Sequence, residues 1–557
     1  MTFRSCVTSF MLALFALLAG APINAQDFSS GSETPALRVG GNVSARAVFY
    51  QASELRARRE PFSWVLNGTV NVQLYGVDMP FSFTLSEQER DFAQPFNQFG
   101  VSPRYEWLTG HFGYRNVTFS PYTLAGHQML GAGFEAQPGL LRAGFMYGRL
   151  QRAVAEDTAA GRFVQPAYER SGFAGRIGVG DGGNQFDVIF LKAKDDPASL
   201  RNTPRNALVL PGENLVLGFS GGVTLFEALR ISMDAAASDY TRDVRAVELE
   251  TTGNSHMEAF DGLINQRASS QFYTAVRGSA AWNARQWGMG LTYTRIDPDY
   301  QSMGAYYIGS DMQSVAIAPR VMLGNGVFRA NATMTWREDN LQDKKAATTT
   351  RMLPAVSLGY QPSPAWGVDV QYTDVFTSQA AGRKPLSDST RLDSSNPMIT
   401  LTPRYTISSA AATHNFLVNL TYQTYLDNNT FTSRYSEYNS TNVHATYALA
   451  LPRQHWSFSL SGNTTRMENL AGTFRNSGVS VGASKAMLEQ TLRVNGTVSA
   501  SFHGVGETIT GSLGSTYNVQ RRHTFSAQLT HVTSSAGYYA QKSFSEITAV
   551  LGYAYSF

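Results

Sequence analysis

The C-terminal end of the chain alternates between large apolar and small or polar residues. Over residues 544–557, one parity carries Ile547, Ala549, Leu551, Tyr553, Tyr555 and Phe557. The opposite parity carries Glu546, Thr548, Val550, Gly552, Ala554 and Ser556. Because successive side chains of a β-strand point to opposite faces, this period of two predicts a strand with one large apolar face. Its aromatic residues lie at the very end, where a membrane-spanning strand meets the boundary between lipid and water.

The same alternation begins near residue 43 and continues along the chain. In residues 62–74 the apolar parity carries Phe62, Trp64, Leu66, Gly68, Val70, Val72 and Leu74. Short connections rich in Gly, Pro and Asn, which suit tight turns, fall near residues 75–78, 137–139, 180–183, 283–287, 324–326, 361–364, 452–455 and 520–522. Longer polar connections fall at 150–169, 195–212, 240–270, 297–311, 338–350, 377–396 and 427–440. Short turns on one rim and long loops on the other describe a meander of about 26 strands, with a range of about 22–26 and both termini on the short-turn side.

Two architectures contain strands of this kind, the soluble β-sandwich and the transmembrane β-barrel. A sandwich uses about seven to nine strands per domain, and each apolar face needs a partner sheet. Here nearly every strand has one apolar and one polar face, as lipid outside and water inside require, and only closure removes sheet edges from lipid. We therefore predict an all-β fold, a single large antiparallel transmembrane β-barrel over residues 38–557.

The N-terminal residues predict secretion. Arg4, an apolar run over residues 10–18 and a small residue at Ala25 together describe a signal peptide over residues 1–25. A short polar periplasmic leader is expected over residues 26–37. The only cysteine, Cys6, lies within the signal peptide, so no disulfide or thiolate metal site is expected in the mature chain. A formal net charge of +3, without a run of Lys or Arg, gives no reason to expect nucleic-acid binding.

The chain end also carries a resemblance to a known class of proteins. A terminal Phe557, with Tyr555 and Tyr553 two and four residues before it, resembles the C-terminal strand of bacterial outer-membrane β-barrels. The resemblance implies that these three residues are the signal read by the barrel-insertion machinery. It further implies a Gram-negative outer-membrane location, contact with membrane lipid, periplasmic short turns and extracellular long loops.

The polar parity of many strands includes an arginine. Those predicted to point into the lumen are Arg46, Arg142, Arg176, Arg230, Arg277, Arg320, Arg329, Arg404 and Arg493. The acids predicted to point inward are fewer: Asp187, Asp234, Asp369 and Glu546. One interpretation is that the arginines tie neighbouring strands through acids and carbonyls. The other is an electropositive lumen that favours anionic solutes.

The stretch from residue 92 to residue 133 is the least barrel-like part of the chain. It contains Arg104, Glu106, Arg115 and His127, and its Gly, Pro and apolar residues suit a loop that folds inward and constricts the channel. A docking surface and an ordinary rim loop are the alternatives. Residues 240–270 and 377–396 are two further candidate constrictions.

The remaining motifs limit the function classes. We expect no enzyme activity, cofactor or metal site, because the nine histidines form no HExxH or HxH motif and no nucleotide-binding glycine pattern occurs. The alternation begins too early for an N-terminal plug domain. A barrel of about 26 strands would be roughly 50 Å wide if circular, so its lumen must be flattened, filled or occupied. We predict a channel for small solutes, with anions favoured. The alternative is an export or assembly barrel, whose lumen a plug, passenger, periplasmic or surface partner protein occupies.

Overall fold

The computed structural model describes residues 37–54, 57–87, 97–156, 164–200, 202, 204, 208–249, 262–504, 506–535 and 543–557. The predicted signal peptide and all of the leader except Leu37 lie outside the described residues. Among the described residues, no helix is long and apolar enough to cross a membrane.

One antiparallel sheet contains all the described strands. They are β1 (Leu37–Ser53), β2 (Phe62–Leu74), β3 (Val77–Ser86), β4 (Gln98–Val101), β5 (Arg104–Tyr105), β6 (Leu108–Asn116), β7 (Gln128–Ala136), β8 (Leu141–Gln151), β9 (Glu169–Gly180), β10 (Gln185–Asp196), β11 (Glu213–Leu225), β12 (Leu229–Thr241), β13 (Ser270–Asn283), β14 (Trp287–Ile296), β15 (Met312–Leu323), β16 (Phe328–Glu338), β17 (Ala347–Tyr360), β18 (Trp366–Thr373), β19 (Phe376–Ala381), β20 (Asp393–Ser395), β21 (Met398–Ser408), β22 (Thr413–Asp427), β23 (Tyr438–Leu451), β24 (Trp456–Asn469), β25 (Gly472–Met487), β26 (Leu492–His503), β27 (Gly506–Val519), β28 (His523–Ser534) and β29 (Phe544–Ser556). The helical elements are short: η1 (Gly324–Gly326), η2 (Asp388–Thr390), α3 (Ser433–Ser436) and η3 (Pro452–Gln454).

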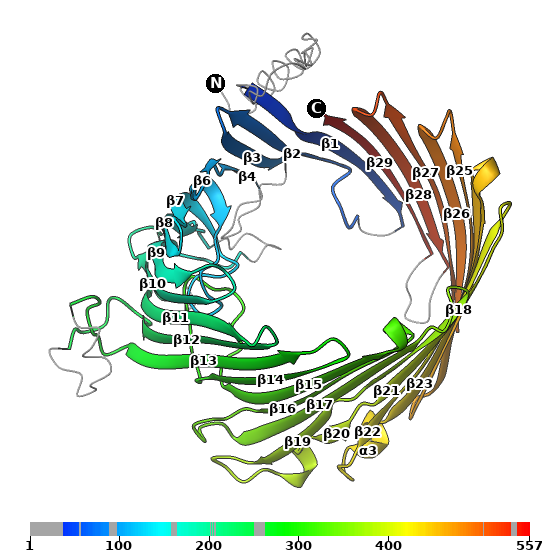
Figure 1. Cartoon of the computed structure of the whole chain (residues 1–557). Helices are drawn as coiled ribbons and strands as arrows, with labels where there is room; N and C mark the ends of the chain where they lie inside the picture. The colour runs from blue at the N-terminus through cyan, green and yellow to red at the C-terminus, as the bar shows by residue number, and fades with distance from the viewer. Residues whose placement is uncertain are drawn as a thin grey trace.

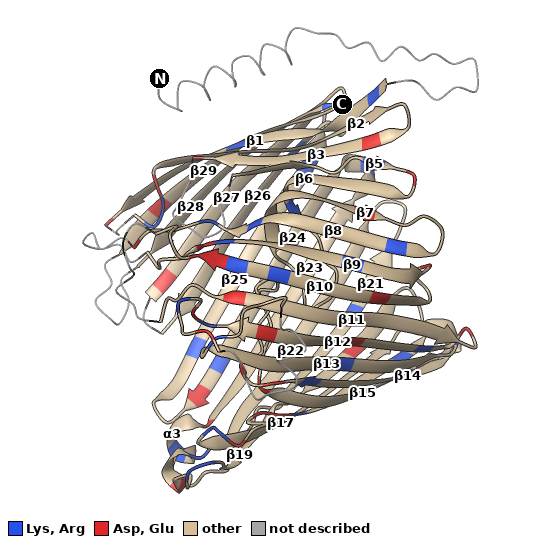
Figure 2. Cartoon of the chain, turned by 90° about the vertical axis from the view of Figure 1, so that its left-hand side faces the viewer, with Lys and Arg blue, Asp and Glu red and all other residues tan. Residues whose placement is uncertain are grey.

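Three strands of the wall are interrupted, so pairs of segments act as single strands. Both β4 and β5 pair with β3, both β18 and β19 pair with β17, and both β20 and β21 pair with β22. The wall therefore has 26 strands, as the sequence predicts. Figure 2 shows short turns along one edge of this wall and longer loops along the other.

The first and last strands close the barrel. β1 pairs with both β2 and β29 (Figure 1). The amide of Gly41 donates to the carbonyl of Phe557 at 2.9 Å, and the amide of Phe557 donates back to Gly41 at 3.1 Å. The last residue of the chain is thus part of the seam, and no sheet edge remains at this junction.

The strand register places the two parities on opposite faces, as predicted. On the outer face Ala47 lies opposite both Trp64 and Leu551, so the apolar residues of three strands share one surface. Aromatic side chains meet near the turn side, where the ring of Tyr360 lies 5.6 Å from that of Trp366. Leu513 and Val498 are 58% and 59% exposed on this surface, which is an apolar belt that only lipid would cover.

The hydrophobic core of the molecule lies inside the barrel, against one part of the wall. Its wall residues come from strands between β7 and β14, among them Met129, Ala174, Ile189 and Ile296. Its other residues come from two connections, residues 117–127 between β6 and β7 and residues 297–311 between β14 and β15. These two connections position the candidate site.

Candidate functional site: a lumen lined on one side

The connection over residues 117–127 folds into the barrel, and we call it the inner segment. Leu124 and Thr123 are completely buried in it. The amide of Phe119 donates to the carbonyl of Leu124 at 2.9 Å, which closes the segment into a compact turn. Thr123 packs on the inward face of Gly218 in β11, where any Cβ atom would meet the Thr123 methyl group. The segment is therefore packed on the wall and does not project from the rim.

The connection over residues 297–311 holds the inner segment in place, and we call it the clamp. The hydroxyl of Tyr300 donates to the carbonyl of Tyr122 at 2.7 Å. Ser302 donates to the carbonyl of Thr123 at 2.5 Å. Because both acceptors are backbone carbonyls of the inner segment, the clamp satisfies polar groups that would otherwise be buried without partners.

The wall itself anchors the clamp through polar side chains that point inward. The amide of Met303 donates to the side-chain oxygen of Asn214 at 3.0 Å. Ser238 donates to the carbonyl of Gln301 at 2.7 Å. Gly304 lies between Leu191 and the inner segment, with no room for a side chain. Strands β6–β14 with the inner segment and the clamp form what we call the lined sector.

His127 ends the inner segment and lies in a buried polar setting. Its ring stacks on Tyr306 with centroids 4.0 Å apart, and the residue is 2% exposed. Burial lowers the pKa of His127 to about 4, while a hydrogen bond with the Gln128 backbone raises it and the charge of Arg170 lowers it further. Arg170 forms a bidentate ion pair with Asp195, at 2.8 and 3.1 Å. The docked segment therefore favours the neutral imidazole.

The wall of β22–β29 has no such lining among its described residues, and we call it the neutral sector. Its inward face carries mostly Ser, Thr, Asn and Gln. These side chains bond across strands, as Thr497 does with Ser512 at 2.6 Å and Asn442 with Thr465 at 2.6 Å. The lumen thus has one sector covered by folded chain and another that presents hydroxyl and amide groups.

The nine predicted lumen arginines fall into three groups. Three form ion pairs on the wall: Arg142 with Asp187 at 2.9 Å, Arg176 with Glu135 at 2.8 Å, and Arg404 with Asp369. Two bond to neutral groups, Arg230 to the carbonyl of Gly183 at 2.5 Å and Arg320 to the side chain of Asn283 at 3.0 Å. The other four have no ion pair or side-chain hydrogen bond within the described chain: Arg46, Arg277, Arg329 and Arg493. The nine arginines therefore include some that tie neighbouring strands together and some that have no such partner within the described chain.

Register also identifies inward arginines that the sequence reading missed. Arg170, already described beside His127, faces Asp195. Arg337 of β16 and Arg351 of β17 lie directly opposite each other. β17 begins at Ala347, inside the stretch 338–350 that was assigned to a connection, so Arg351 lies within a strand and not at its edge. The alternation over residues 328–338 already contains the signal for Arg337.

The four residues assigned to a constricting loop are not brought together. Arg104 lies in β5 and Glu106 in the turn that follows. Arg115 belongs to β6, where it donates to Ser82 at 3.0 Å and to the carbonyl of Pro80 at 3.4 Å. Of the four, His127 alone belongs to the inner segment. The inward fold predicted for residues 92–133 is thus confined, among the described residues, to a shorter part of that stretch.

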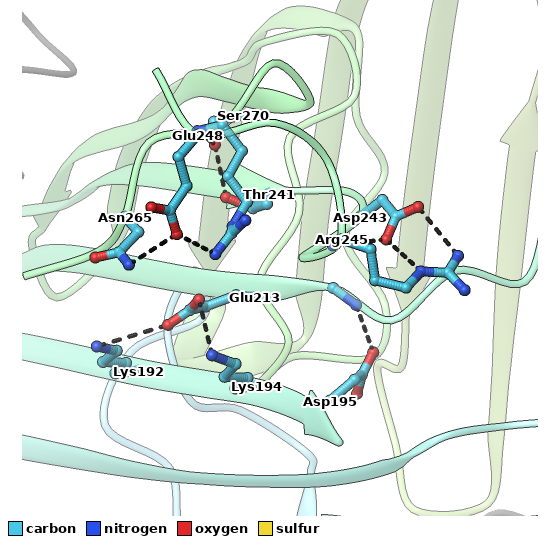
Figure 3. Close-up of polar contacts among 12 residues, drawn as sticks. Lys192, Lys194, Asp195, Glu213, Thr241, Asp243, Arg245, Glu248, Asn265 and Ser270 are labelled. Atoms are coloured by element: carbon cyan, nitrogen blue, oxygen red, sulfur yellow. Dashed lines mark hydrogen bonds and ion pairs between the residues drawn. The ribbon is translucent and has the colours of Figure 1, made fainter. Parts of the chain in front are cut away.

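The described parts of residues 240–270 do not enter the lumen, which corrects that expectation. Ile264 packs against Leu215 and Phe272, both on the outer face of the wall. Lys192 donates to the carbonyl of Leu263 at 2.7 Å. The loop follows β12 outside the ring in Figure 1, and Figure 3 shows its ion pairs together with those of Lys192 and Lys194 to Glu213. Charged residues on the outer face above the apolar belt favour this placement, because the loop supplies them with polar partners.

Residues 377–396 likewise do not constrict the lumen. Their ends form β19 and β20, which continue the wall by pairing with β17 and β22. Between them, the carbonyls of Asp388 and Arg391 accept hydrogen bonds from Asn429 at 2.8 Å each. This stretch is therefore part of the rim.

The C-terminal aromatic residues lie on the outer face beside the seam. Tyr553 shares a hydrogen bond of 2.9 Å with His523, and the rings of Tyr555 and Phe557 stack at 5.4 Å. Their role as an insertion signal stays a prediction.

The fold defines the class of protein. The wall is closed and antiparallel, and it has 26 strands. Its outer belt is apolar, its inner face is polar, and both of its ends lie on the short-turn side. These features define a transmembrane β-barrel of the bacterial outer-membrane type. The chain is therefore an outer-membrane protein of a Gram-negative bacterium.

Comparisons with known proteins assign the chain to no family. No family model matches the chain, and no curated protein matches it in sequence. The translocation pore of the P pilus usher PapC is 9% identical, with a TM-score of 0.39, and the match covers 94% of this chain and 100% of that chain. OccAB2 of Acinetobacter baumannii is 13% identical, with a TM-score of 0.30 and coverages of 67% and 97%. The anion-selective porin from Comamonas acidovorans is 11% identical, with a TM-score of 0.27 and coverages of 67% and 96%. At these TM-scores the likenesses carry no argument about function.

Proposed function

We propose that this barrel is a channel for small solutes, in which the inner segment and the clamp narrow the lumen. The observation that carries the proposal is the buried core inside the barrel, which fills space on one side and leaves the neutral sector uncovered. A hydroxyl- and amide-lined wall lets hydrated solutes exchange hydrogen bonds with water and protein as they pass.

We further propose that the channel favours anions. Arg46 and Arg493 point into the lumen without an ion pair within the described chain, and no acid lies opposite either of them in the neighbouring strands. Uncompensated charges on a pore wall raise the local concentration of counter-ions and oppose ions of the same sign. The ion-paired arginines do not add to this effect, since each is balanced by a carboxylate.

The composition of the neutral sector also helps to choose between a solute channel and an export barrel. A lumen that holds a folded passenger or plug is expected to present extended apolar patches, and the inward face of β22–β29 presents mainly Ser, Thr, Asn and Gln. This composition favours solutes over a partner protein. The barrel-insertion machinery remains the expected partner during assembly.

Conductance and reversal potential in a planar bilayer test this proposal. We expect steady conductance with anion preference, and a reduced preference when Arg46 and Arg493 are both replaced by Gln. The matched control is Arg475→Gln, which removes a charge from the outer face of β25. Unchanged selectivity in this double variant would contradict the anion preference. A silent barrel would contradict the channel and direct the search to a plug protein.

A further inference from the structure

Strands β15–β17 form a part of the wall that lies outside both the lined and the neutral sector. Their inward faces include four arginines, Arg320, Arg329, Arg337 and Arg351, and no Asp or Glu. Elsewhere in the wall, inward acids such as Asp187 and Asp369 balance arginines. We call these four residues the arginine strip.

The strip has one pair of arginines at each end. At the loop side, Arg337 lies directly opposite Arg351. Like charges directly opposite each other in an antiparallel pair are destabilising, and their Cβ atoms lie about 4.5–5.5 Å apart. Neither guanidinium has an ion pair or hydrogen bond within the described chain. An anion between them would remove the repulsion.

At the turn side, Arg320 and Arg329 are diagonal neighbours. Arg320 pairs with Asn331, and Arg329 pairs with Met322, so their Cα atoms lie about 7–8 Å apart. Arg320 is held by Asn283 at 3.0 Å, with its side chain across Gly288, while Arg329 is exposed. One arginine of this pair is therefore oriented by the wall and the other is free to meet a ligand.

Two carboxylates in the loops above the strip, those of Asp311 and Asp339, have other partners. Asp311 and Asp339 both pair with Lys345. Asp311 also accepts from the amide of Leu341 at 2.9 Å, and Asp339 from the amide of Thr349 at 2.7 Å. With two acids and one lysine, this cluster offsets only part of the charge of the loop-side pair.

Guanidinium groups bind phosphate and carboxylate groups through paired, charge-assisted hydrogen bonds. Two guanidiniums at one place favour anions that carry two or more negative charges close together over monovalent ions. We propose that each end of the arginine strip binds compact multivalent anions, such as phosphate esters. This inference rests on the proposed channel function, and it names the solute class that the channel selects.

The arginine strip has one pair toward each mouth of the channel. Arg329 and Arg337 are eight residues apart on β16, about 27 Å along the strand. A compact anion cannot bridge this distance, so the two pairs act as separate sites. A solute released by one pair meets the other on the same wall before it leaves the lumen.

Binding of inorganic tripolyphosphate to the purified barrel tests the inference without reference to conductance. By calorimetry we expect two tripolyphosphate ions bound per barrel, and the loss of one of them in each of two double variants, R337Q/R351Q and R320Q/R329Q, because each variant removes the charge-assisted hydrogen bonds of one site. Arg475→Gln is the control, and heat-dependent migration in gels verifies that each variant folds.

A second readout assigns each pair to its mouth. In a planar bilayer, tripolyphosphate added on the loop side should block current through the wild type and not through R337Q/R351Q, while R320Q/R329Q should lose block from the turn side. Equal numbers of bound tripolyphosphate ions in the wild type and both double variants would overturn the strip as a site, even if conductance is normal. Binding without any conductance would instead overturn the channel and leave the strip as a binding site.

Discussion

The lined sector and the neutral sector belong to one continuous sheet, and yet they stabilise the molecule differently. In the lined sector, inward residues such as Ile189 and Leu191 are buried, because the inner segment and the clamp cover them. In the neutral sector, inward residues such as Ser499 and Thr510 meet water and one another. The polarity of an inward face therefore depends on what contacts it. Ser and Thr occur where the face meets water, and Ile, Leu and Met occur where it meets packed chain.

The largest effect should follow from removing the cover itself. Replacing residues 118–126 by a Gly/Ser linker of equal length should raise single-channel conductance several-fold, since the lumen then widens on the lined side. Replacing the three-residue turn 520–522 in the neutral sector by Gly and Ser is the control and should leave conductance unchanged. Equal conductance in the segment variant and the wild type would show that the inner segment does not limit the pore.

Shortening a buried side chain of the inner segment should weaken the packing of this segment on the wall. Leu124 is completely buried, and Leu→Ala changes at such sites cost about 2–5 kcal/mol. Hydrogen exchange at the amides of Phe119 and Ala125, which donate to Leu124 and Gly304, should accelerate accordingly. Leu417→Ala is the matched change in the neutral sector; Leu417 points inward but is 38% exposed, so its effect should be below about 1 kcal/mol. Similar losses of unfolding free energy at both positions would contradict the claim that the lined sector has a packed inner core and the neutral sector has none.

Acid should loosen the lined sector first. The pKa of His127 in the folded protein is lowered from 6.5 to about 4, so docking of the inner segment is fully stabilised above pH 6.5 and weakens as the pH falls toward 4. A shift of this size corresponds to about 3 kcal/mol. Hydrogen exchange of residues 117–127, measured between pH 7 and 4 and corrected for the intrinsic rate, should show progressive loss of protection.

A variant identifies the responsible group. His127→Asn should abolish most of this pH dependence. Persistence of the same profile in the variant would assign the pH dependence to a group other than His127.

The smallest effect is expected from the hydroxyl pairs of the neutral sector. Thr497→Val removes the 2.6 Å bond to Ser512 but leaves both positions open to water. The change in the free energy of unfolding, measured by urea titration in lipid vesicles, should stay below about 1 kcal/mol because water replaces the lost partner. A larger cost would mean that this hydroxyl network supports the wall as much as the core does.

Local alternation was enough to predict the strands, their faces and the closed barrel. The reason is that a strand in a membrane barrel meets lipid on one side and the lumen on the other, so each residue reports its own face. For residues 92–133 the sequence suggested an inward fold, because their Gly, Pro and apolar residues suit such a loop, but it left a docking surface and an ordinary rim loop open. Parity assigned the arginines to the inward face, but it does not say which of them has a carboxylate within reach, as Arg142 has and Arg329 has not.

The paths of the long loops depended on contacts that no local pattern contains. Residues 297–311 lie inside because Asn214 and Ser238, on two other strands, offer partners to Met303 and Gln301. The described ends of residues 240–270 lie outside because Lys192 and Asp239 on the outer face need partners there. The barrel could be predicted from the sequence, because the period-two alternation is present within each strand and needs no information from distant residues. The tertiary structure alone decided which loops fill the lumen, because that choice is made by buried polar groups brought together from strands far apart in the chain.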